Sequence, residues 1–165
     1  MFIPFDQLPE SSRIWIYQTD RQLTTTEVNA MSDHLRSFSE RWTTHAKPMR
    51  ASFIVWHDQF IVLAADESKN GASGCAIDES VNALKEIEQL FSVHLLNRGV
   101  VTFLQNDKTV TIPIAALQSA LAEGQWNANS LVVDTTVRTI GEMKNRWIQP
   151  AKSTWLNRYL SKVVA

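Results

Sequence analysis

The chain has 165 residues and a formal net charge of −1; 44% of its residues are hydrophobic and 20% are charged. This composition is that of a globular protein and excludes a largely disordered chain. The single cysteine excludes an intramolecular disulfide framework and a cysteine-based zinc cluster. The net charge is close to zero, whereas proteins that bind double-stranded nucleic acid usually carry an excess of basic residues.

No segment has the pattern of an export signal or of a membrane span. The beginning, MFIPFDQLPESS, contains two prolines and no basic residue, whereas a signal peptide needs a basic start and an apolar core. The longest apolar runs, such as 60–65, have the length of a strand, and a transmembrane helix needs about 20 apolar residues. Together with the lone thiol, these features predict a cytoplasmic protein.

The first elements are predicted from local patterns. Residues 13–19 alternate between two sets of large side chains, which favours a strand covered on both sides. Thr24 and Glu27 have the spacing of a capping box, which satisfies two N–H groups at a helix start. An apolar stripe with spacings of three and four residues follows and predicts an amphipathic helix: Val28, Met31, Leu35, Phe38 and Trp42.

Further along, two apolar runs at 51–57 and 60–65 are joined by Asp58-Gln59, which predicts a hairpin. After a polar loop, Asp78 is the expected N-cap of a second helix whose apolar period begins at Val81. A strand over 100–104 completes the order strand, helix, strand, strand, helix, strand. This order predicts an α+β fold: a ferredoxin-like βαββαβ antiparallel sheet with two helices on one face.

The last third has shorter elements. We expect short strands at 109–112 and 130–133, a helix that Pro113 opens and Gly124 ends, and two further short helices. The chain is therefore predicted to contain a core domain over residues 1–106 and a small C-terminal α/β module over residues 107–165 packed on it.

Charge is distributed unevenly along the chain. Residues 58–90 contain seven acidic and two basic residues, and residues 138–162 contain six basic and one acidic residue. Two solvated faces would explain this pattern. Alternatively, the basic end meets the acidic segment or an acidic partner.

An apolar strand that ends in Asp66-Glu67 has the pattern of a Walker B element, in which the acidic residues serve Mg²⁺ and the attacking water. The phosphate-binding loop that must accompany it, G-x-x-x-x-G-K-[ST], does not occur, and the chain contains no Gly-Lys pair. We therefore predict that the protein is not a P-loop ATPase.

The segment GASGCAID, residues 71–78, is the candidate ligand-binding loop. Its glycines permit positive φ angles, and backbone N–H groups at a helix start can bind an anion. A cysteine in such a place can be nucleophilic, although the surrounding acidic residues oppose this and a buried, inert thiol is the simpler interpretation. The candidate ligand-binding residues are Asp66, Glu67, Gly71, Ser73, Gly74, Cys75 and Asp78. The four histidines lack metal-ligand spacing, so we expect neither a metal nor a cofactor.

Three of the six tryptophans lie in the last third beside basic residues. Exposed Trp and Arg are typical of binding hot spots, and tryptophans also stack on single-stranded bases; the simpler alternative is that they anchor the C-terminal segment. The candidate partner-binding residues are Trp126, Arg146, Trp147, Lys152, Trp155 and Arg158.

Residues 11–18, 42–45, 72–81 and 145–155 together resemble a family of small bacterial proteins that often carry the label "ABC transporter ATPase". The S-G-C-x-I-D segment is the most specific part of this resemblance, which implies no established activity and no catalytic residues. The ABC signature L-S-G-G-Q is absent here, like the phosphate-binding loop.

The last third is also similar to small GYF-like modules, through Ile112-Pro113-Ile114-x-x-Leu117, Leu121-x-x-Gly124 and 130–133. This similarity implies a fold that binds protein segments, although the aromatic motif of those modules is missing. We therefore expect a non-enzymatic binding or protein-interaction module. The alternative is a small enzyme or an anion-binding or ligand-binding protein that uses the loop at 71–78 with Asp66, Glu67 and Cys75.

Overall fold

The computed structural model describes residues 1–96 and 99–162. The chain divides into two compact units: unit 1 comprises residues 1–96 and 138–143, and unit 2 comprises residues 97–137 and 144–165. The division after Leu96 precedes the predicted boundary at residue 106, which falls in a hairpin turn of unit 2. Residues 138–143 return to unit 1, where Thr139 bridges to Arg13.

Unit 1 is built on an antiparallel sheet and two long helices. Its elements are η1 (Phe5–Gln7), β1 (Arg13–Thr19), α1 (Thr25–Arg41), β2 (Thr43–Thr44), β3 (Lys47–Pro48), β4 (Arg50–Trp56), β5 (Phe60–Asp66), α2 (Gly74–Phe91) and β6 (Leu95–Leu96). α4 (Ile140–Arg146) begins in this unit and ends in unit 2.

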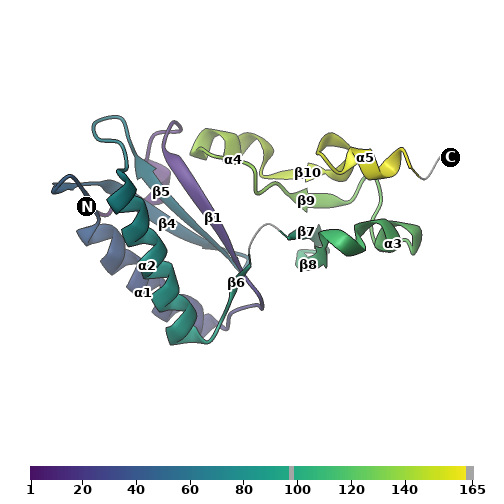
Figure 1. The fold of residues 1–165 in the computed structure, drawn as a ribbon, viewed down its shortest axis with the longest axis horizontal. Coiled ribbons are helices and arrows are strands. Elements are labelled where there is room, and N and C mark those ends of the chain that lie inside the picture. Colours follow the sequence, from purple (N-terminus) through teal and green to yellow (C-terminus); the bar gives the residue numbers. More distant parts are fainter. Residues whose placement is uncertain (97–98, 163–165) are drawn as a thin grey trace. The chain divides into compact units, whose positions relative to one another are not determined.

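The main sheet of unit 1 has the strand order β4-β5-β1-β6, and neighbouring strands are antiparallel. Figure 1 shows α1 and α2 on the same side of this sheet. The register places Leu63 between Trp15 of β1 and Phe53 of β4, and all three belong to the core under the helices. The prediction of an α+β chain with antiparallel sheets is confirmed.

α1 forms where its sequence predicts. The Thr24 hydroxyl accepts a hydrogen bond from the Glu27 N–H, and the Glu27 carboxylate accepts one from the Thr24 N–H, so the capping box is present. Met31, Leu35 and Phe38 are buried, as is Trp42, the C-cap residue of α1. The predicted stripe therefore faces the core, with Val28 half-buried at its beginning.

Tight hairpin turns without glycine connect several strands. His57 and Asp58 between β4 and β5 both have positive φ angles, of 50° and 54°. Asn106 and Asp107 adopt the same conformation in the next long hairpin, with φ angles of 51° and 61°. Two successive positive φ angles define a type I′ turn, whose twist matches that of paired strands. The predicted hairpin is correct, and its turn is centred one residue earlier than Asp58-Gln59.

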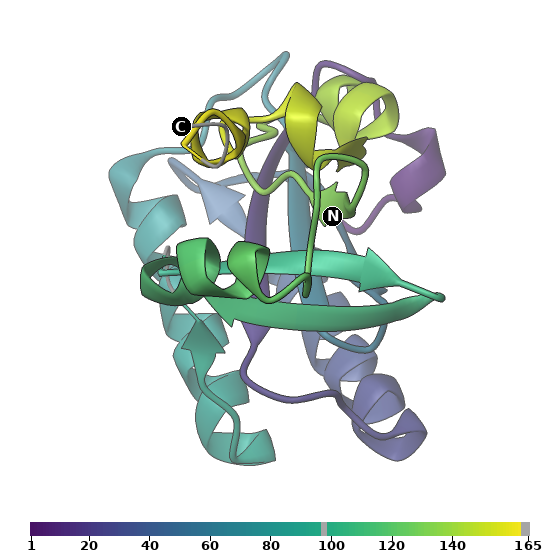
Figure 2. The same ribbon diagram turned by 90° about the vertical axis from the view of Figure 1, so that its right-hand side faces the viewer.

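Unit 2 has its own antiparallel sheet, with the strand order β10-β9-β7-β8. The prediction that a strand over 100–104 completes the sheet of unit 1 is wrong, because β7 belongs to this second sheet and β6 is the fourth strand of the first. Figure 2 shows β7 and β8 side by side as its long hairpin, followed by α3. The elements are β7 (Val100–Gln105), β8 (Lys108–Pro113), η2 (Ile114–Ala116), α3 (Leu117–Ala122), β9 (Leu131–Val133), β10 (Ile148–Pro150), η3 (Ala151–Ser153) and α5 (Asn157–Leu160).

The core of unit 2 is small and aromatic. Phe103 and Trp126 stack with their ring centroids 5.5 Å apart, and Leu117, Ala151 and Leu156 are fully buried beside them. Gly124 ends α3 with a φ of +75°, a conformation that favours glycine. None of the helices formed by the described residues combines the length and apolar character needed to cross a bilayer.

Candidate functional site

Two candidate carboxylates, Asp66 and Glu67, precede the candidate ligand-binding loop and are held by neighbouring groups. Asp66 is buried; its Oδ1 accepts from the Ser68 N–H at 3.0 Å, and its Oδ2 lies 3.1 Å from Arg50 Nη1. Hydrogen bonding to Ser68, and less strongly the Arg50 charge, lower the pKa of Asp66 despite burial. Glu67 Oε1 accepts from the Ala72 N–H at 2.8 Å and lies 3.8 Å from Arg13 Nη1.

The start of α2 lies earlier than predicted. The Ser73 side chain accepts from the Ala76 N–H at 3.1 Å, so Ser73 is the N-cap and Gly74 is the first helical residue. The prediction of Asp78 as N-cap is wrong, because Asp78 lies inside α2 and is exposed. Gly74 does not use the positive φ that a glycine permits; among the described residues, Gly124 is the glycine with that conformation.

A threonine from another element holds the loop against β2. The Thr44 hydroxyl donates to the Gly71 carbonyl at 2.9 Å and accepts from the Ser73 N–H at 3.1 Å. The N–H groups of Ala72, Ser73 and Ala76 are thus used inside the protein. Because Glu67 already occupies one of them, an incoming anion would meet a carboxylate in the position that it needs. These contacts hold the loop against β2 and the end of β5.

Cys75 is exposed on the first turn of α2. The simpler interpretation of the sequence, a buried thiol, is therefore wrong. Among the described residues no hydrogen bond joins Cys75 to a histidine. Residues 1–96 and 99–162 also contain no group of three or more His, Cys, Asp or Glu side chains that could hold a metal ion.

Two of the candidate partner-binding tryptophans are interior residues. Trp126 is 1% exposed, and its Nε1 donates to the Leu117 carbonyl at 2.9 Å. Trp147 is also buried, and its backbone carbonyl accepts from the Asp134 N–H at 2.8 Å. Their assignment to a binding surface is therefore wrong. Both rings fill interior space, which is the anchoring role that the sequence left open.

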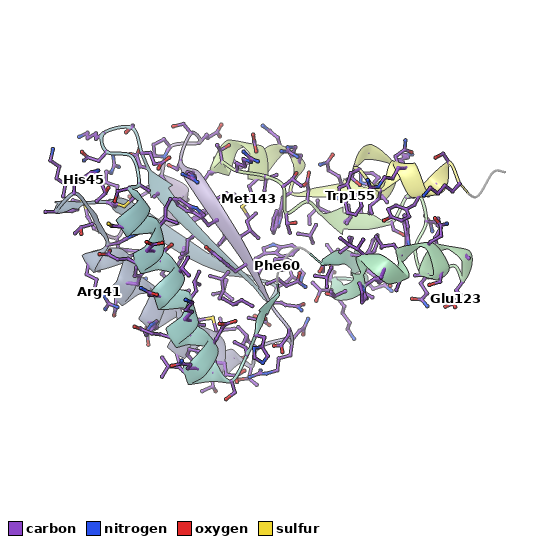
Figure 3. All side chains as sticks on the ribbon, in the orientation of Figure 1. Arg41, His45, Phe60, Glu123, Met143 and Trp155 are labelled. Carbon is purple, nitrogen blue, oxygen red and sulfur yellow. The ribbon has the colours of Figure 1, made fainter. Side chains whose placement is uncertain are left out.

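Two of the other candidates of the last third, Arg146 and Trp155, line an open hollow in unit 2. The hollow has a volume of about 320 Å³. Polar and charged side chains line most of it, and a tryptophan lines the rest. The lining residues are Asp134, Thr136, Arg146, Gln149, Ser153, Thr154 and Trp155. Trp155, labelled in Figure 3, precedes α5 and is 41% exposed.

Asp134 organises the floor of the hollow. Its Oδ2 accepts from Arg146 Nη1 at 2.7 Å and from Gln149 Nε2 at 3.0 Å. Its Oδ1 accepts from both the N–H and the hydroxyl of Thr136. Gln149 also donates to the Arg146 carbonyl at 3.0 Å. These charge-assisted bonds fix the Arg146 guanidinium at the hollow, with 39% of its side chain still exposed.

Beside the hollow, Trp155 forms a basic and aromatic cluster with Arg158 and Tyr159. The Arg158 guanidinium lies over the Trp155 ring, 4.8 Å from its centroid, and 5.5 Å from that of Tyr159. Tyr159 contacts Trp155 edge-on at 6.0 Å and the buried Trp126 at 6.3 Å. Lys152 in η3 is exposed.

The structure thus brings Arg146 and Trp155 together at one hollow and places Arg158 against Trp155. Sequence reasoning missed the remaining lining residues. Asp134-Thr135-Thr136 has the pattern of an Asx turn, in which the carboxylate accepts from the N–H two residues later, and this pattern was a usable signal. Gln149, Ser153 and Thr154 carry no comparable local signature.

Chemically, the hollow offers hydroxyl, amide and guanidinium groups beside an indole. Such groups bind a side chain through stacking and hydrogen bonds. In comparisons with known proteins, no family model, no curated protein and no solved structure matches the chain.

Proposed function

We propose that the protein is a non-enzymatic, cytoplasmic binding module that recognises a segment of a partner protein through the hollow of unit 2. The observation that carries this proposal is an exposed tryptophan, Trp155, at the edge of a polar hollow and in contact with Arg158. Tryptophan, tyrosine and arginine are the residues that contribute most at protein interfaces. The Arg158 guanidinium already contacts the Trp155 ring without a partner, and such a preformed contact reduces the entropy lost on binding.

For unit 1 we propose the ferredoxin-like arrangement and a supporting role. Two features support this topology: the order β4-β5-β1-β6, and α1 and α2 on the same side of the sheet. The contacts of Asp66, Glu67 and Ser73 support a structural role for the loop between β5 and α2. The binding function is therefore assigned to unit 2.

Selection of random peptides displayed on phage tests the proposed function. Immobilised wild-type protein should enrich a set of related peptides, and Trp155→Ala should lose them. Leu90→Ala is the matched control because Leu90 is a large apolar side chain, 64% exposed, on α2 of unit 1; this variant should retain the enriched set. Thermal melts of both variants check that the fold is intact, as expected for exposed positions.

Two results would contradict the proposed function. One is the absence of enrichment by wild-type protein. The other is an enriched set that Trp155→Ala binds as well as wild type does, since the bound surface would then lie elsewhere.

A further inference from the structure

The charges around the hollow of unit 2 specify the chemistry of the partner segment. Residues 144–162 contain five basic residues and no acidic one. Among the described residues that line the hollow, Asp134 is the acidic one, and its two oxygens accept hydrogen bonds from Arg146, Gln149 and Thr136. The charges of Asp134 and Arg146 offset each other, so the positive charge that remains for a partner comes from the exposed residues Lys152, Arg158 and Lys162. Charge complementarity therefore favours an acidic partner.

The basic groups continue from the hollow along a chain of contacts. Trp155 lines the hollow, Arg158 lies over Trp155 and Tyr159, and Lys162 Nζ lies 5.9 Å from the Tyr159 ring centroid. Arg158 and Lys162 are exposed. A guanidinium held against an aromatic ring is well placed to bind a carboxylate through two N–H groups.

We infer that the partner segment is an acidic peptide. On this inference, which rests on the proposed function, one side chain of the peptide enters the hollow and contacts Trp155. Carboxylates that flank this side chain pair with Arg158 and Lys162. The hollow volume of about 320 Å³ is at the lower end of the range for ligand pockets, so it has room for a single side chain.

The same surface is less suited to a single-stranded nucleic acid, which is bound on a series of aromatic platforms along a basic groove. Among the aromatic residues described between 144 and 162, Trp155 is exposed, Tyr159 is half-buried and Trp147 is buried. Arg158 also lies over the Trp155 ring. The described surface therefore provides one partly covered platform rather than a series.

Fluorescence anisotropy with synthetic probes tests the inference. The probes are labelled peptides of about twelve residues with a central Phe, flanked by Glu and Asp in one peptide and by Gln and Asn in the other. A labelled oligo(dT) of the same length is the third probe. Wild-type protein should bind the acidic peptide at least about tenfold more tightly than the neutral one, and added salt should weaken this binding.

Variants locate the charge effect. Arg158→Ala should weaken binding of the acidic peptide about threefold to tenfold, as expected for loss of an exposed charge pair with hydrogen bonds. Lys108→Ala removes the same charge from an exposed position at the start of β8 and should change the affinity by less than about twofold. Trp155→Ala should abolish binding of both peptides.

The outcomes separate this inference from the proposed function. Equal binding of neutral and acidic peptides, lost in Trp155→Ala, would overturn the acidic partner and leave a protein-binding module. If the peptides enriched by the phage selection contain no acidic residues, the acidic partner is likewise overturned and the protein-binding module remains. Tighter binding of oligo(dT) than of either peptide, with the same sensitivity to Trp155→Ala, would overturn both. Failure of the acidic peptide to bind would also overturn the inference.

Discussion

The indole Nε1 of Trp42 donates a 2.8 Å hydrogen bond to the backbone carbonyl of Ala76, and both groups are buried. Trp42 caps the end of α1, and Ala76 lies in the first turn of α2. The bond therefore ties the end of one helix to the beginning of the next. Ala76, which directly follows the conspicuous S-G-C sequence of residues 73–75, supplies the acceptor for this bond.

Trp42→Phe should destabilise the protein by about 1–3 kcal/mol, because it removes a buried hydrogen bond while keeping an aromatic ring against Phe38. Urea denaturation monitored by circular dichroism measures this change. Trp155→Phe is the control, because Trp155 is exposed, and its effect should stay within about 0.5 kcal/mol. Equal effects of the two substitutions would show that the Trp42 bond contributes nothing.

The N-cap of α2 gives a second stability prediction. Ser73→Ala should cost about 0.5–2 kcal/mol, since the Ala76 N–H loses its acceptor. Asp78→Ala, inside the helix and exposed, should change stability by less than about 0.5 kcal/mol. The same denaturation experiment compares the two variants, and a larger cost for Asp78→Ala would move the cap to that residue.

The difference between these two positions shows where sequence reasoning is limited. α1 was predictable because its capping box and stripe of large apolar residues are local signals. In α2 the predicted apolar pattern begins at Val81, but this side chain is 37% exposed. The face that packs begins earlier, with the small residues Ala76, Ser80 and Ala83. Small side chains give a weak hydrophobic pattern, so the helix start was placed too late.

The candidate site depends even more on distant contacts. Trp126 is buried because its ring meets Phe103 and its Nε1 reaches the Leu117 carbonyl. Nothing beside it in the sequence distinguishes it from the exposed Trp155. Composition therefore indicates the region in which the candidate site lies, whereas packing between strands and short helices decides which tryptophan reaches the surface.

Two glycines should respond in opposite directions to alanine. Gly74 is helical, and a Cβ built there meets no atom within 4 Å, so Gly74→Ala should stabilise the protein by about 0.4–1 kcal/mol. Gly124 has an equally open environment but a φ of +75°, so Gly124→Ala should be destabilising by about 1–2 kcal/mol. Denaturant midpoints measure both changes, and destabilisation by Gly74→Ala would contradict its helical placement.

Glu27 links helix capping to the pH dependence of stability. Its two carboxylate oxygens accept from Arg21 Nη2 and Nη1 at 2.8 and 2.9 Å, and one also accepts from the Thr24 N–H at 2.8 Å. Arg21 Nη2 donates in addition to the Phe91 carbonyl, the last residue of α2. Hydrogen bonding to Arg21, followed by that to Thr24, lowers the pKa of Glu27 from 4.5 to about 2.

Because the folded state lowers this pKa, the charged carboxylate stabilises the fold above the unfolded value of 4.5, and this contribution decreases as the pH falls toward 2. Glu27→Gln should therefore be less stable than wild type at pH 6, and the difference should shrink between pH 5 and pH 2. Glu79→Gln removes the same charge from an exposed position of α2 and serves as the control. Urea denaturation along a pH series measures these differences, and titration of the Glu27 carboxyl carbon by NMR measures the pKa directly. A difference that stays constant with pH, or a Glu27 pKa near 4.5, would show that the Arg21 pair does not hold in solution.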